Sequence, residues 1–205
     1  MQIELEVGRG FVGAGLKTPS LTRSRAQGIA DYHARFQEAV LGGNVYTLST
    51  PLAGTTVAAG GVVANPLLAL VNPAGNRFAY TVWRTTFYAI SGTVATGLVP
   101  YIMGTVPAAL ATTNVNAVNN LVGTSGSGTG KGYAAVTSAI ANQVFWRPMT
   151  QFLTIPTAGY NVSSELIDGE VVVAPSGAFG INAPGTGTSF VCFASITYEE
   201  IQVAL

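Results

Sequence analysis

The sequence contains few charged residues. Lys and Arg contribute nine residues and Asp and Glu another nine, so charged side chains make up 9% of the 205 residues, where a soluble domain commonly carries about 25%. Hydrophobic residues reach 48%, which excludes an intrinsically disordered chain. The formal net charge of +0 argues against a nucleic-acid partner. Because a neutral chain is prone to associate, we expect a subunit that works in an assembly.

Cysteine and histidine are nearly absent, with one residue of each type, Cys192 and His33. A single cysteine excludes an intramolecular disulfide and a cysteine-based zinc site. A Cys–His nucleophile pair would need both residues, but Cys192 lies between Val191 and Phe193 in a predicted buried strand, where a thiol is normally inert. We therefore expect no catalytic residue, no metal site and no cofactor.

The sequence also lacks the patterns of export and membrane insertion. Its first residues have neither the basic nor the apolar region of a secretory signal. The uncharged run 85–130 is long, but Pro100, Pro107 and several glycines interrupt it, which leaves no stretch of about 20 mainly apolar residues. We predict no membrane partner.

The few charges are unevenly distributed. Nine of the 18 lie in the first 38 residues, whereas residues 39–164 carry four, all basic, and the rest of the chain carries five, all acidic. This shift predicts an N-terminal arm, residues 1–43, joined to a neutral body, residues 44–205, with Gly42 and Gly43 as the natural hinge.

Within the arm, an extended segment is followed by a predicted helix over about 22–41. Ser20 or Thr22 can cap its start, and Gly42 can end it. Apolar side chains recur at spacings of three and four residues, as in the narrow seam through which helices pack. The seam consists of Ala26, Ile29, His33, Phe36 and Val40. It predicts an oligomer or anchor contact, and packing of the helix on its own body is an equal alternative.

The body has the composition of strands. Residues 81–90 are rich in β-branched and aromatic side chains. Residues 190–198 alternate, with one face predicted to hold Phe190, Cys192, Ala194, Ile196 and Tyr198. After residue 43, only segment 133–142 has a composition that could be helical.

Turn-forming residues interrupt these strands at short intervals, as at 72–75, 168–169 and 175–177. Short strands with frequent turns are typical of sandwiches and jelly rolls. We predict an all-β, jelly-roll-like antiparallel β-sandwich with an N-terminal arm containing one α-helix.

Two glycine-rich segments match nucleotide-binding patterns only in part. Segment 8–13 reads G-x-G-x-x-G, but no helix opens inside it and no β/α alternation follows, as a dinucleotide site requires. Segment 125–132 differs from a phosphate-binding loop at both ends, since Ser125 and Gly132 replace the required Gly and Ser or Thr. We predict that this second segment is a mobile surface loop with a basic tip.

Three acidic residues lie close together in the sequence: Glu165, Asp168 and Glu170. Paired carboxylates of this kind carry out glycoside hydrolysis, which makes glycan cleavage the best enzymatic alternative. However, Asp168 and Gly169 form a strong turn dipeptide, and acids that flank a turn are usually solvated. We predict that the protein is not an enzyme.

Several short segments together resemble structural proteins of tailed-bacteriophage particles. The likeness spans most of the chain through motifs of moderate specificity: ADYHARFQEAV at 30–40, LVNPAG at 70–75, DGEVVVAPSG at 168–177 and SITYEE at 195–200. The resemblance implies a β-sandwich or jelly-roll body, commonly trimeric, attached to the particle, and it implies no catalytic residues.

The resemblance and the composition together lead to one expected function. We expect a homotrimeric capsid decoration or cement protein, located in the virion after assembly in the host cytoplasm, whose arm binds other virion proteins, above all the major capsid protein. The alternative is a tail-associated or fibre-like protein that binds a host-surface glycan through loops such as 125–132. An enzyme that cleaves such a glycan ranks third.

Overall fold

The computed structural model describes residues 37–57, 65–92, 97–106, 113–123, 128–134, 140–152, 161–182 and 190–203. The chain divides into two units, Met1–Gly42 and Gly43–Leu205, and each is described by itself. In the first unit, helix α3 spans Gln37–Leu41, and its last helical hydrogen bond runs from Gly42 N to Glu38 O at 2.8 Å. The helix ends where the sequence predicts. Its predicted start and the extended segment before it lie outside the described residues.

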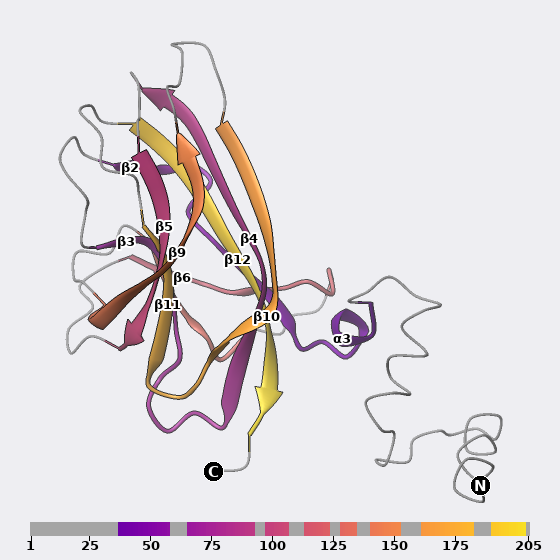
Figure 1. The fold of residues 1–205 in the computed structure, drawn as a ribbon. Helices are drawn as coiled ribbons and strands as arrows, with labels where there is room; N and C mark the ends of the chain where they lie inside the picture. Colours follow the sequence, from indigo (N-terminus) through magenta and orange to yellow (C-terminus); the bar gives the residue numbers. More distant parts are fainter. Residues whose placement is uncertain are drawn as a thin grey trace, which may run out of the picture. The chain divides into compact units, whose positions relative to one another are not determined.

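The second unit consists of two antiparallel sheets (Figure 1). The first sheet has the order β10–β4–β12–β1–β7, with β2 also paired to β12. Its strands are β1 (Val45–Ser49), β2 (Thr55–Val57), β4 (Phe78–Gly92), β7 (Val118–Asn119), β10 (Asn161–Val173) and β12 (Phe190–Gln202). The second sheet has the order β6–β8–β3–β11–β5–β9. Its strands are β3 (Pro66–Val71), β5 (Gly97–Thr105), β6 (Thr113–Val115), β8 (Lys131–Ala134), β9 (Ala141–Phe152) and β11 (Gly177–Asn182).

The strand pairing is that of a jelly roll. Among the main strands, the first pairs with the last, the second with the last but one, and so on inward: β1 with β12, β3 with β11, β4 with β10 and β5 with β9. Successive pairs alternate between the two sheets, so the chain follows a long hairpin that is rolled up. The shorter strands β6, β7 and β8 extend the sheet edges. The predicted fold class is confirmed.

Alternating side chains build the core between the sheets. In β12, Cys192, Ala194, Ile196 and Tyr198 are buried, while Phe193 and its neighbours on the other face are half-buried. This is the predicted period of two, and it places every second residue of the strand in the core. The facing sheet supplies the other half of the core, including Leu68, Leu70, Val99, Tyr101, Phe179 and Ile181.

Two of the predicted turns connect strands. At the first, Asn72 is fully buried, and its side-chain amide donates to the carbonyls of Phe78 and Val173, both at 2.8 Å. The second contains Ser176 in the left-handed region, with φ 69°, and the Ser176 amide donates to Asn72 O at 3.0 Å. Through these hydrogen bonds, Asn72 holds the β3–β4 and β10–β11 connections together at one end of the sandwich.

The structure differs from a local expectation at Asp168–Gly169, and it limits another at segment 133–142. Asp168 and Gly169 have positive φ angles of 54° and 84°, but they form an irregularity inside β10 rather than a turn between strands. The register with β4 shifts between Leu166 and Val171, so the dipeptide makes a bulge. The segment 133–142 is not helical at its described ends, because Tyr133 pairs in register with strands on both sides of β8 and residue 141 opens β9.

Candidate functional site

The predicted helical seam is described only at its last residue. Val40 lies in α3 and is half-buried. Ala26, Ile29, His33 and Phe36 lie outside the described residues. The seam, and with it the boundaries of the arm and the body, therefore stay predictions.

The acidic residues of segment 165–170 meet a single arginine from the other sheet. Arg147 Nη2 lies 2.7 Å from Glu165 Oε1, and Arg147 Nη1 lies 2.8 Å from Glu170 Oε2. The guanidinium carbon stands 4.0 Å from the centroid of the Trp146 ring. Because β9 and β10 are the edge strands of the two sheets, this network joins the sheets along one side of the sandwich. Asp168 lies on the bulge, where its side chain is exposed.

Glu165 has a second partner in the core. The Tyr101 hydroxyl donates to Glu165 Oε2 at 3.0 Å and also forms a short hydrogen bond with the Thr85 hydroxyl. Burial raises the pKa of Tyr101, and the nearby carboxylate of Glu165 adds to the shift. A glycosidase needs one carboxyl group that is protonated and free to give up its proton. Glu165 and Glu170 instead share the guanidinium of Arg147, an arrangement suited to holding the sheets together.

Cys192 is an internal packing residue. Its side chain is fully buried, and the thiol donates to Thr55 O at 3.4 Å. Burial raises its pKa to about 12, so the thiolate, which is the nucleophilic form, is strongly disfavoured. The other member of the hypothetical pair, His33, lies outside the described residues.

The predicted basic loop is partly a strand. Lys131 and Gly132 belong to β8, so the prediction of a mobile loop was wrong for this end of segment 125–132. Just before them, the amides of Thr129 and Gly130 donate to Glu200 Oε1 at 2.6 and 3.2 Å. Glu200 is buried, with 8% of its surface exposed, and it therefore fastens this segment to β12. Residues 125–127 lie outside the described part of the chain.

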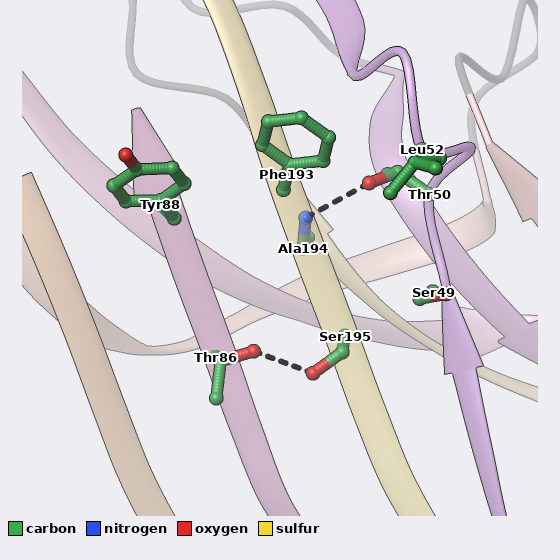
Figure 2. A pocket seen from close by; sticks show the side chains of 8 residues that line it. All are labelled: Ser49, Thr50, Leu52, Thr86, Tyr88, Phe193, Ala194 and Ser195. Carbon is green, nitrogen blue, oxygen red and sulfur yellow. Dashed lines mark hydrogen bonds between the residues drawn. The ribbon is translucent and has the colours of Figure 1, made fainter. Parts of the chain in front are cut away.

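Sequence reasoning missed a pocket on the outer face of the first sheet, which Figure 2 shows. It is open and has a volume of about 250 Å³. Its lining residues come from β4, β12, the last residue of β1 and the connection after it: Ser49, Thr50, Leu52, Thr86, Tyr88, Phe193, Ala194 and Ser195.

The pocket forms at the connection between β1 and β2, where the chain leaves its pairing with β12. Thr50 keeps this point attached, since its amide donates to Ala194 O at 3.0 Å and its hydroxyl oxygen accepts from Ala194 N at 3.2 Å. Gly54 then turns the chain with φ +77°, and a Cβ atom there would lie 2.6 Å from Val191 Cγ1 and 3.2 Å from Phe193 Cζ. The turn can pack against Phe193 because residue 54 is glycine, and it leaves Leu52 97% exposed at the rim.

Two cross-strand pairs form the rest of the pocket. Tyr88 and Phe193 lie opposite each other in the β4–β12 register, with ring centroids 5.9 Å apart and ring planes 23° apart. Two residues further along each strand, on the same face of the sheet, the hydroxyls of Thr86 and Ser195 are hydrogen-bonded to each other, as the dashed line in Figure 2 shows. The pocket thus places a stacked aromatic pair beside a group of hydroxyls.

Other kinds of site receive no support from the described residues. Among them, no group of three or more His, Cys, Asp or Glu residues is placed to hold a metal ion. No helix within the described ranges is long and apolar enough to cross a membrane. No family model, curated protein or solved structure matches this chain.

Proposed function

We propose that this protein is a structural component of a bacteriophage particle, in the form of a trimeric decoration or cement protein that its N-terminal arm attaches to the capsid. The sequence resemblance supports this proposal, and so does the jelly-roll body, because viral capsid proteins use this fold. Lectins use it as well, and a fold by itself does not decide a function. The exposed side chains of the body therefore bear on the choice between these functions.

The observation that carries the proposal is a set of exposed apolar side chains on the two long edge strands β9 and β10. These are Val144, Phe145, Val162, Leu166 and Val172, with exposed fractions between 48% and 69%. We call them the β9–β10 edge. A free monomer usually protects such an edge with charges, but here Arg147, Glu165 and Glu170 are engaged in ion pairs with one another. The edge is therefore suited to contact with another copy of the chain.

The geometry of these strands also indicates how copies would meet. The register between β5 and β9 is irregular around Pro148, and Pro cannot donate a main-chain hydrogen bond. The bulge at Asp168 and Gly169 likewise interrupts the regular strand pairing of β10. Both features oppose continuation of a sheet into a neighbouring subunit. Copies would instead pack through side chains, and neutral side chains can be buried without stranding a charge.

Attachment to shells is the first test. Purified full-length chain would be mixed with capsid shells that lack it and sedimented with them, beside a variant without residues 1–41. The full chain should sediment with the shells, and the shortened chain should stay in solution and retain the β-sheet circular dichroism signal of the body. Binding of both the full and the shortened chain would show that the attachment site lies in the body. Binding of neither would contradict the cement role.

Self-association is a separate test. Val162→Asp places a charge on the β9–β10 edge, where Val162 is 69% exposed, and Val122→Asp is the matched control at a residue that is 94% exposed in the loop after β7. In analytical ultracentrifugation, the Val162 variant should be monomeric, while the control and the natural chain should be trimeric. Trimers of both variants would show that subunits meet elsewhere.

A further inference from the structure

We infer that the pocket on the outer face of the first sheet binds a neutral saccharide unit of an oligosaccharide chain. This inference goes beyond the proposed place in a particle and does not rest on it, because a cement role requires no ligand. It starts from the composition of the pocket wall, which offers aromatic rings and hydroxyl groups and no charged side chain.

The position of the pocket in the sheet limits what can bind there. Strand β4 lies between β10 and β12, and β12 lies between β4 and β1, so the main-chain groups of both strands are used in the ladders. A peptide that binds as an added strand needs a free sheet edge, and this pocket does not offer one. The ligand must therefore be recognised by side chains. Without a charge in the wall, an anionic or cationic group would lose water and gain no partner.

The two halves of the pocket match the two kinds of surface on a sugar ring. A pyranose has faces of C–H groups, which can pack on an aromatic ring, and a circumference of hydroxyls. Tyr88 and Phe193 supply half-buried rings. Beside them, Thr86 and Ser195 share one hydrogen bond, and since each hydroxyl has one donor and two acceptor positions, that bond leaves capacity for a ligand. Thr50 likewise uses only an acceptor position in its bond to Ala194 N.

The size of the pocket and its rim indicate what part of a glycan would enter. The volume of about 250 Å³ is below the range of about 300–1,000 Å³ that is typical of pockets for drug-sized ligands. It suits a single ring. Leu52 stands 97% exposed beside the pocket, where its side chain can pack against the next unit of the chain. Because the pocket is open and holds a single ring, we expect weak binding, with a dissociation constant on the order of 1 mM.

Ligand-observed NMR on the full chain tests the inference. The probes are lactose, maltose and N,N′-diacetylchitobiose, with sialyllactose as the anionic counterpart of lactose. At least one neutral probe should show saturation transfer. Phe193→Ala should abolish that transfer, and Leu52→Ala should weaken binding several-fold. Leu52 is almost fully exposed, so its substitution cannot fail by unfolding the protein. Val122→Ala is the matched control for Leu52→Ala, because it shortens an apolar side chain that is 94% exposed in the loop after β7 and should leave binding unchanged.

Three results would overturn the inference: no transfer to any neutral probe, a preference for sialyllactose over lactose, or binding that neither Leu52→Ala nor Phe193→Ala reduces. None of these three results bears on the proposed function, because attachment to shells is measured without glycan. Conversely, a chain that binds a neutral saccharide but no shell would reject the cement role and leave the pocket assignment in place.

Discussion

Arg147 provides a quantitative test of how the two sheets are held together along the β9–β10 edge. The substitution Arg147→Met keeps the aliphatic stem of the side chain beside Trp146 and removes its charge. It breaks two ion pairs of nearly equal length, 2.7 Å to Glu165 and 2.8 Å to Glu170. Distance alone would therefore assign both pairs the same energy.

Burial predicts a different result. The Glu165 side chain is 27% exposed and also accepts from Tyr101, whereas the Glu170 side chain is 59% exposed. An exposed pair contributes about 0–1 kcal/mol, and removing one partner of a fully buried pair costs about 3–5 kcal/mol. We expect the partly buried pair with Glu165 to fall between these limits, at about 1–2 kcal/mol, and the pair with Glu170 to contribute less than about 0.5 kcal/mol.

Double-mutant cycles measure the two pairs separately. Arg147→Met would be combined with Glu165→Gln in one cycle and with Glu170→Gln in the other. The free energy of unfolding would come from urea titrations at one fixed protein concentration, because association contributes to apparent stability. Equal coupling energies in the two cycles, or a larger one for Glu170, would refute the argument from burial.

The remaining predictions concern buried ionisable groups. Burial raises the pKa of Tyr80 from 10.0 to about 12, so its contribution to stability should be complete below pH 10.0 and lost as the pH rises from 10.0 to about 12. Urea unfolding midpoints across this window should fall less for Tyr80→Phe than for the natural chain, and an equal fall would count against the assignment. Burial likewise raises the pKa of Cys192 to about 12. A thiol reagent should therefore label Cys192 in denaturant but not in the native protein, and rapid native labelling would contradict its placement in the core.

The fold class could be predicted because its signals are local. The alternation along β12 and the turn residues around Asn72 each lie within a few positions of one another, and both describe the structure correctly. The ambiguous signal was Asp168–Gly169. Bulges and hairpin turns both use positive φ angles, so the dipeptide alone does not distinguish an irregular strand from the end of one.

The sites could not be predicted because they depend on long-range pairing. Thr86 and Ser195 are 109 positions apart in the sequence, and only the register of β4 against β12 brings them to one pocket. The same holds for Arg147, which reaches Glu165 and Glu170 across two sheet edges. The sequence did contain one usable signal. Phe193 is an aromatic residue on the face of its strand opposite Cys192, Ala194 and Ile196. An aromatic side chain outside the core can indicate a binding surface.

Heating of shells tests most directly the proposal that this chain reinforces a capsid shell. Shells with and without the full-length chain would be heated while release of their contents is followed by dye fluorescence. The account predicts that bound protein raises the temperature of release, and that Val162→Asp, which charges the β9–β10 edge, reduces this gain. Shells that carry the protein and release their contents at the same temperature as bare shells would contradict it.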